Sequence, residues 1–159
     1  SFARSGAGLV ILEASGVEAA GRITHGCAGL YSDENEAAMA RVVALCKSVG
    51  HSKMGVQLAH AGRKASTQRP WEGGVALTQD AWQTYAPSAI AFDNGWHTPE
   101  ALDAAGMARI KGAFVAAVGL ARSAHALASR VPLLCQREAL GLVSTVCSHH
   151  QRVDAGGAV

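Results

Sequence analysis

Two short apolar runs constrain the fold of this chain more than any other feature of its sequence. Residues 8–15 read GLVILEAS, and residues 53–62 read KMGVQLAHAG. Each run is aliphatic or β-branched over most of its length and is bounded by glycine or polar residues, a pattern typical of strands buried on both faces of a sheet. We therefore expect two strands in the interior of an α/β fold.

A helix is predicted between the two runs. Residues 32–50 offer Ser32 or Asp33 as an N-cap, carry acidic residues in the first turn and Lys47 in the last, and stop at Gly50. The positions at helical spacing that predict its apolar face are Met39, Val42, Val43 and Cys46.

A long polar and aromatic loop follows the second run, and a second helix is predicted after it over residues 98–124. Thr98 or Asp103 can cap this helix. The resulting order of strand, helix, strand and helix argues for parallel βα units, as in a (β/α) barrel or a doubly wound sheet. The residues that mark the apolar face of the second helix are Ile110, Phe114 and Val118.

The composition narrows the class of protein. Of the 159 residues, 49% are hydrophobic and 16% are charged, so the chain can form one globular domain with a core. A net charge of +2 without any basic run argues against a nucleic-acid partner. No apolar run in the sequence approaches the length needed to cross a bilayer, so we expect no membrane partner either.

The cysteines and the first residues bear on the cellular location of the protein. The four cysteines are scattered and form no C-x-x-C pair, which predicts reduced thiols in the cytoplasm rather than a disulfide framework. The chain begins at Ser1, without a methionine or the apolar core of a signal peptide, from which we expect a fragment or a processed product.

Polar residues follow each predicted strand at the point where the strand ends. Glu13 and Ala14 lie at the end of the first strand, and Gln57, His60 and Arg63 lie on or just beyond the end of the second. In parallel βα proteins ligands gather at the carboxyl ends of the strands. An amide such as that of Gln57 donates and accepts hydrogen bonds at once, which suits the alternating carbonyls and nitrogens at the edge of a flavin-type ring.

Four stretches of this sequence together resemble the old yellow enzyme family, specifically its bacterial xenobiotic-reductase-like branch of NADH:flavin oxidoreductases. They are GLVILEASGVEAAGRITHGCAGLYSDE, GVQLAHAGRKAS, RPWEGG and APSAIAF, and they follow one another in the family's order within about residues 2–118. The resemblance implies an α/β fold that is a partial (β/α)8 TIM barrel of about two to three βα units. Within this segment it implies an FMN site.

The resemblance also implies an activity and two cofactor contacts. Family members pass hydride from NAD(P)H through FMN to activated alkenes such as α,β-unsaturated carbonyls. Carried over to this chain, the backbone of Ala14 would bind the C4 carbonyl side of the flavin, and Gln57 would hydrogen-bond its pyrimidine edge. His60 and Arg63 would support the shape of the strand end. A homo-oligomer is a further expectation.

Some family features have no counterpart in this sequence. The family's first strand, with a flavin-tuning cysteine and a substrate tyrosine, would lie before Ser1. After the second helix the family carries a strand with the pattern H-x-A-H-G-Y, and residues 130–151, RVPLLCQREALGLVSTVCSHHQ, predict no such strand. His149 and His150 are adjacent, so on a strand they would point to opposite faces. The catalytic residues are therefore unknown.

The composition changes near residue 118. From Gly119 onward the chain contains no Phe, Trp, Tyr or Lys. We therefore expect residues 1–118 to be a partial flavin-binding βα-barrel segment and residues 119–159 to be a divergent tail, read out of frame or truncated.

Several residues have structural alternatives to a functional role. Glu13 is expected to pair with a nearby cation or backbone N–H. Two roles stay open for Arg63, a solvated loop charge or a contact to a phosphate or to the ring edge. Cys147, His149 and His150 lack the second pair of ligands that structural zinc needs, so no metal is expected. The aromatic side chains of the loop form either a mini-core of their own or part of a lid or subunit contact; they are Trp71, Trp82, Tyr85 and Trp96.

Two functions remain open on the sequence. One is an FMN-dependent ene-reductase that is truncated and catalytically impaired. The other is a non-catalytic barrel remnant that binds partners or associates with itself, because a closed barrel needs about 250 residues.

Overall fold

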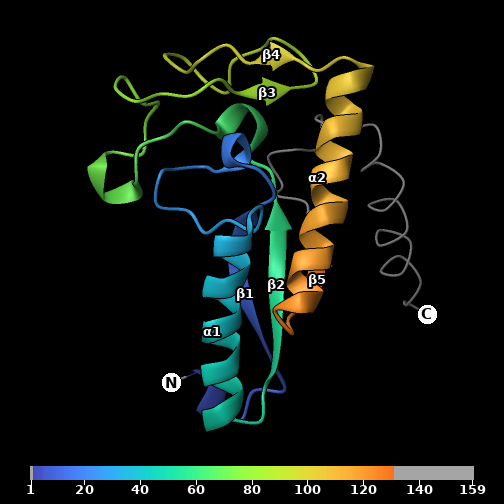
Figure 1. Ribbon diagram of the computed structural model, residues 1–159. Helices are drawn as coiled ribbons and strands as arrows, with labels where there is room; N and C mark the ends of the chain where they lie inside the picture. Colours follow the sequence, from blue (N-terminus) through green and yellow to red (C-terminus); the bar gives the residue numbers. More distant parts are fainter. Residues whose placement is uncertain (1, 131–159) are drawn as a thin grey trace, which may run out of the picture.

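A computed structural model describes residues 2–130 of the chain (Figure 1). Two helices and three strands alternate along most of this length, and a loop with two short strands interrupts them between β2 and α2. The elements are η1 (Phe2–Arg4), β1 (Leu9–Gly16), η2 (Ala19–Gly21), α1 (Asp33–Val49), β2 (Lys53–Ala59), η3 (Gly62–Lys64), η4 (Pro70–Glu72), β3 (Tyr85–Ala86), β4 (Glu100–Ala101), α2 (Ala104–Ser123) and β5 (Leu127–Arg130).

The main sheet has three parallel strands in the order β1-β2-β5. Helix α1 connects β1 to β2, and α2 precedes β5, so each parallel pair is joined through a helix as βα units require. The prediction of parallel βα units is confirmed, and the molecule is an incomplete α/β barrel of the TIM type. The strands β3 and β4 form a separate small parallel pair above the main sheet (Figure 1).

Both helices pack against one face of this sheet. Val56 and Leu58 of β2 are fully buried under them, and Val43 of α1 and Ala121 of α2 meet them in the same core. Burial of these side chains is the main stabilising contribution of the fold. The remaining buried members of this core are Val17, Leu30, Met39, Met54, Ala117, Ala124 and Ala126.

The opposite face of β1 is not covered by any residue that the structure describes. Leu9 and Ile11 point to this face and are exposed, while the alternate residues Val10 and Leu12 pack against the core. The prediction that both strands are buried on both faces is therefore wrong for β1. It fails because no residue among 2–130 packs against the face of β1 that carries Leu9 and Ile11.

Helix α1 begins and ends as predicted. The Ser32 hydroxyl accepts a hydrogen bond from the Asn35 backbone N–H at 3.3 Å, and Gly50 is the C-cap. Met39 and Val43 are buried, but Val42, expected on the same face, is exposed. Its helical position lies at the margin of the buried stripe, where the sheet no longer covers it.

Helix α2 starts later than the predicted range. Asp103 is the N-cap and accepts a hydrogen bond from the Gly106 N–H at 2.7 Å, whereas residues before it form β4. Ile110 is buried, and Phe114 and Val118 are partly buried against the core. The predicted apolar face of α2 is thus confirmed.

The change in composition near Val118 does not coincide with the end of an element. Helix α2 continues to Ser123, and the strand β5 then pairs with β2. The boundary at residue 118 stays a prediction, and the part of the expected tail from residue 131 to 159 lies outside the described residues.

Within the described residues, one helix is long and apolar enough to cross a membrane, judged by length and composition alone. This helix is α2, so the expectation that no segment approaches that length is corrected. A core helix can share these properties, and α2 packs against the sheet through Ala117 and Ala121.

Candidate functional site

The candidate site begins where β1 and β2 end side by side. Leu12 of β1 pairs with Val56, and Ser15 pairs with Leu58, so two residues of β1 face the single residue Gln57 of β2. The two residues are Glu13 and Ala14, and the irregularity is a β-bulge. The predicted adjacency of Ala14 and Gln57 is confirmed.

A bulge matters here because it leaves backbone groups outside the ladder of the sheet. Ala14 and Gln57 are both partly buried, and the Gln57 side chain accepts and donates no hydrogen bond within the described residues. The strand ends therefore place backbone that lies outside the sheet ladder beside an uncommitted amide, and of this backbone the Glu13 carbonyl accepts from the Ser15 hydroxyl at 3.1 Å. The role of these two residues in holding a flavin stays a prediction.

Gln57 lies in the middle of the sheet rather than at its edge. On its other side it is in register with Ser129 of β5. A strand thus follows α2 beside the Gln57 strand, and it ends at Arg130, the first residue of the range in which the sequence predicted none. The sequence missed it because LASR is a short stretch with only one large apolar residue.

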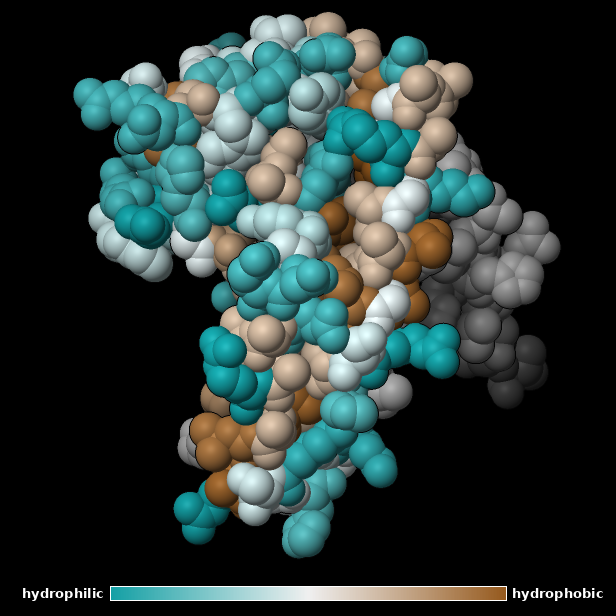
Figure 2. All heavy atoms as spheres, in the orientation of Figure 1, coloured by the Kyte–Doolittle hydropathy of each residue, from teal (hydrophilic) through white to brown (hydrophobic). Residues whose placement is uncertain are grey.

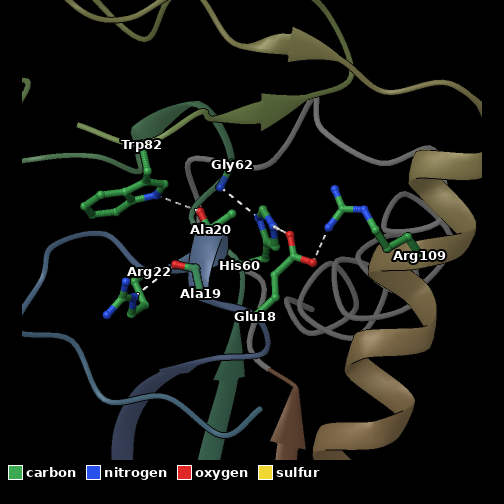
Figure 3. Close-up of polar contacts among 8 residues, drawn as sticks. All are labelled: Glu18, Ala19, Ala20, Arg22, His60, Gly62, Trp82 and Arg109. Atoms are coloured by element: carbon green, nitrogen blue, oxygen red, sulfur yellow. Dashed lines mark hydrogen bonds and ion pairs between the residues drawn. The ribbon is translucent and has the colours of Figure 1, made fainter. Parts of the chain in front are cut away.

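His60 follows β2 and is buried just beyond the end of the strand. Its Nδ1 accepts a hydrogen bond from the Gly62 N–H at 3.1 Å, and its Nε2 lies 2.9 Å from Oε1 of Glu18 (Figure 3). A ring nitrogen that accepts from an N–H carries no proton, so the proton sits on Nε2 and is donated to the carboxylate. The expectation of a packed histidine bonded to backbone is confirmed, with Glu18 as an additional partner.

Gly21 is needed for His60 to sit where it does. A Cβ at position 21 would lie only 2.7 Å from Cδ2 of the His60 ring. Gly62, which donates to the ring, has φ of +62°, a conformation that favours glycine. Two glycines therefore fix the position of the imidazole.

Glu18 links three segments that are far apart in the sequence. It accepts from His60 after β2 and forms an ion pair with Arg109 of α2, while it lies itself between β1 and η2 (Figure 3). The hydrogen bond from His60 lowers the pKa of Glu18 most, and Arg109 lowers it further, against the opposing effect of burial. The guanidinium of Arg109 also lies over the Tyr85 ring, 4.7 Å from its centroid.

Glu18 and Arg109 are not among the site residues that the sequence predicts. Glu18 is 42 residues from His60 and 91 residues from Arg109, so no motif spacing joins them. The available signal was indirect, because Glu18 falls within the stretch that resembles the family, just past the first strand end.

Trp82 fixes the long loop to the strand ends. Its ring Nε1–H donates to the Ala20 carbonyl at 3.1 Å, and its backbone N–H donates to the Ser66 hydroxyl at 3.0 Å. The guanidinium of Arg22 lies 5.5 Å from the Trp82 ring centroid, and His25 meets the ring edge-on. The loop is thereby held over η2 (Figure 3).

The other aromatic residues of the loop do not join Trp82 in one cluster. Tyr85 contacts Arg109, Trp96 packs against Phe92, and Trp71 is exposed. Of the two alternatives, a mini-core shared by these four rings is therefore wrong for the described loop, and a lid or subunit contact stays a prediction. Each ring instead packs against a different part of the chain.

Two charged residues near the strand ends, Arg63 and Glu13, differ in whether they have a hydrogen-bond partner. The Arg63 guanidinium donates to the Ser88 hydroxyl at 3.0 Å, which supports a role in shaping the loop. Glu13 is exposed, and its carboxylate has no partner within residues 2–130, contrary to the expected local pairing.

Metal-binding residues are not gathered anywhere in residues 2–130, where no group of three His, Cys, Asp or Glu side chains could hold an ion. Cys27 and Cys46 are free thiols. Cys147, His149 and His150 lie outside the described residues.

Over part of their length, known flavin oxidoreductases are similar to this chain. The chain is 44% identical over 97 residues to an NADPH dehydrogenase of Bacillus subtilis, a match that covers 61% of this chain and 25% of that protein. It is 36% identical over 118 residues to an NADH:flavin oxidoreductase of Gibberella zeae, covering 70% of this chain and 28% of the relative. No protein-family model matches the chain.

Solved structures agree on the fold. Morphinone reductase superposes with a TM-score of 0.66 at 26% identity, over 80% of this chain and 36% of the enzyme. An old yellow enzyme from Pichia superposes with a TM-score of 0.66 at 20% identity, over 80% of this chain and 34% of that enzyme. The chain spans about a quarter of the length of the curated relatives it matches, and over that segment the expected resemblance is confirmed.

Proposed function

Because this chain carries a segment similar to the old yellow enzymes, we propose that it binds a flavin, FMN, at the carboxyl ends of β1 and β2. The observation that carries the proposal is the bulge that sets two β1 residues against Gln57. Backbone groups of Ala14 and the amide of Gln57 would together hold the pyrimidine edge of the ring. The donor set fits that edge, because it offers both hydrogen-bond donors and acceptors side by side.

The residues just beyond the two strand ends would keep these ends in place. His60 follows the Gln57 strand, Glu18 follows the Ala14 strand, and their hydrogen bond of 2.9 Å joins the two ends. Arg109 extends this connection to α2. These side chains are positioning residues in the proposal and do not touch the flavin.

We further propose that the chain is related in activity to NAD(P)H-dependent flavin oxidoreductases that act on activated alkenes such as α,β-unsaturated carbonyls. A bound flavin supplies hydride transfer between a reduced nicotinamide and such a substrate. In this chain turnover is expected to be weak or absent, because the H-x-A-H-G-Y pattern is missing from its sequence. A cytoplasmic setting remains part of the proposal and is supported by the free thiols Cys27 and Cys46.

A second candidate function is a non-catalytic barrel remnant. The exposed face of β1, with Leu9 and Ile11, favours it, because a closed barrel would cover such a face. The two candidates differ in whether flavin binds and whether it is reduced.

Titration of FMN with the purified 159-residue chain tests the proposal. We expect quenching of FMN fluorescence, and Gln57→Leu should weaken the affinity by about tenfold, equivalent to roughly 1.4 kcal/mol for a lost hydrogen bond to a polar ring edge. Gln83→Leu is the matched control, because Gln83 is exposed in the loop and bonds only the Thr84 carbonyl.

Equal affinities of the two variants would remove Gln57 from the site, and absence of quenching would reject flavin binding altogether. If flavin binds, anaerobic mixing with NADPH and cyclohexenone separates the two functions. Turnover at the rate of an intact reductase would contradict the proposed impairment, whereas binding without reduction supports the remnant.

A further inference from the structure

The chain contains two asparagines, Asn35 and Asn94, and their surroundings differ. The side-chain amide of an asparagine can be attacked by the backbone nitrogen of the next residue, because the two groups are close in the covalent chain. Glu36 follows Asn35, and Gly95 follows Asn94. The two asparagines therefore allow a comparison of the same chemistry within one molecule.

Asn94 and Gly95 are the central residues of a β-turn in the long loop between β2 and α2. The Trp96 backbone N–H donates to the Asp93 carbonyl at 3.1 Å and closes the turn. The side chains of Asp93 and Asn94 and the backbone of Gly95 are exposed. Figure 2 shows mainly hydrophilic residues over the part of the long loop that faces the viewer, so water reaches this region.

Gly95 supplies a backbone nitrogen with few restraints. Its φ is +79°, which glycine adopts readily, and a Cβ at this position would meet nothing within 4 Å. Among residues 2–130 the Gly95 N–H has no hydrogen-bond acceptor. Its nitrogen is therefore free to rotate toward the side chain of Asn94.

Asn35 is held in the first turn of α1. Its own N–H donates to the Ser32 hydroxyl at 3.3 Å. The N–H of Glu36, whose nitrogen would have to attack, donates to the Ser32 carbonyl at 3.0 Å. Asn35 is also partly buried, and its Oδ1 is shielded from water. The helix thus keeps this nitrogen away from the side-chain amide.

We propose that Asn94 is a site of spontaneous deamidation. The Gly95 N–H gives its proton to hydroxide, and the nitrogen attacks Cγ of Asn94. The Cγ–Nδ2 bond then breaks, and Nδ2 takes a proton from water and leaves as ammonia, which closes a succinimide ring and regenerates hydroxide. Water opens the ring at Cγ to give aspartate, or at the main-chain carbonyl carbon to give isoaspartate. No oxidant or reductant is needed.

The products change both the charge and the length of the loop. Each product carries a new carboxylate next to Asp93. Isoaspartate also adds one atom to the main chain between Phe92 and Trp96, whose ring centroids lie 4.7 Å apart. The Lys64 ammonium lies 5.5 Å from the Phe92 ring centroid. The reaction therefore alters the part of the loop that contacts η3, just beyond the end of β2.

Incubation of the full 159-residue chain at several pH values, followed by peptide mass spectrometry, tests the proposal without any flavin. We expect the peptide that contains Asn94 to gain the mass difference between a hydroxyl and an amino group, and to separate into aspartate and isoaspartate forms. It should react at least about tenfold faster than the peptide that contains Asn35. The rate should rise with pH, because the attacking nitrogen must first lose its proton.

Two glycine variants locate the attacking group. Gly95→Ala should slow the reaction by about tenfold, because a Cβ restricts the rotations that bring the nitrogen onto Cγ of Asn94. Gly74→Ala is the matched control, since Gly74 has a φ of +69° in the same loop and its added Cβ would meet only the Pro70 backbone at 3.9 Å. It follows a glycine, so it should leave the rate at Asn94 unchanged. Circular dichroism checks that both variants are folded.

Three outcomes would overturn the proposal. Equal rates at Asn94 and Asn35 would show that the exposed turn does not promote the reaction. A rate that Gly74→Ala lowers as much as Gly95→Ala would show that the Gly95 nitrogen is not the attacking group. Aspartate without any isoaspartate would mean that water attacks the amide directly and that no succinimide forms.

Discussion

Glu18 is the residue that joins the most segments just beyond the strand ends of the candidate site. It is largely buried, receives the His60 proton in a hydrogen bond and is paired with Arg109. A carboxylate with such partners contributes to stability only while it is ionised. This dependence gives the protein a testable response to acid.

Stability should fall in acid through Glu18. Because its pKa in the folded chain is below the usual value of 4.5, its contribution is present above that pH and is lost as the pH falls through the lowered folded value. Glu18→Gln should lower the free energy of unfolding at pH 7 by about 1–3 kcal/mol and flatten this acid dependence. Urea unfolding at a series of pH values measures both effects.

Glu72 provides the matched control for this prediction. It also has a pKa held below its usual value, by the Arg69 backbone first, but it is fully exposed. Glu72→Gln should therefore change stability little at any pH, because exposed ion pairs are screened by water. A loss as large as that of Glu18→Gln would show that burial is not what distinguishes the two carboxylates.

At the scale of elements, two glycines are present for different reasons. Gly21 is required by close packing, whereas Gly112 only lowers the helix propensity of α2. Gly21→Ala places a Cβ against the His60 ring and should destabilise the chain by about 1–3 kcal/mol. Gly112→Ala meets open space in α2 and should stabilise it by about 0.5–1 kcal/mol. Thermal unfolding of the two variants should shift in opposite directions, and shifts of the same sign would contradict the packing around His60.

The helices could be predicted from sequence because their signals are local. Ser32 and Gly50 cap α1 within the same stretch of chain, and Asp103 caps α2. The strand β5 could not be predicted, since its pairing with β2 depends on residues about 70 positions earlier in the chain, as Leu127 and Gly55 show. Local sequence patterns indicate helix caps and hydrophobic periodicity, but they do not indicate which distant strands pair.

Only part of the candidate site could be predicted from the sequence. The adjacency of Ala14 and Gln57 follows from two parallel strands that end together, and it was expected. Glu18, in contrast, acquires its partners only through the folded arrangement of a loop, a strand end and a helix. No spacing in the sequence could have indicated it.

At the scale of the whole molecule, the run of residues 8–15 led to an overestimate of burial. The composition of this run is that of a strand covered on both faces, yet Leu9 and Ile11 are exposed in the described fold. An apolar run of this kind is stable when both faces of the strand are covered. Residues 2–130 cover only the face that carries Val10 and Leu12.

Removing residues 119–159 should abolish cooperative unfolding, whereas removing residues 131–159 should not. The shorter piece loses β5 together with three buried core residues, Ala121, Ala124 and Ala126. Denaturant unfolding followed by circular dichroism distinguishes the two pieces. If the piece ending at residue 118 unfolded as cooperatively as the longer one, the compositional change would mark a true structural boundary.

The bulge at Glu13 and Ala14 divides β1 into two halves that are out of phase. Before it, alternate side chains face the helices, and after it Ser15 and Gly16 are both buried as the chain turns toward the loop. An uninterrupted ladder would carry the first alternation through to the end and would send the loop, with Glu18 at its start, to the wrong side of the sheet. The extra residue in the bulge thus changes which side chains face the core, and it allows an apolar strand to be followed directly by the polar residues of the candidate site.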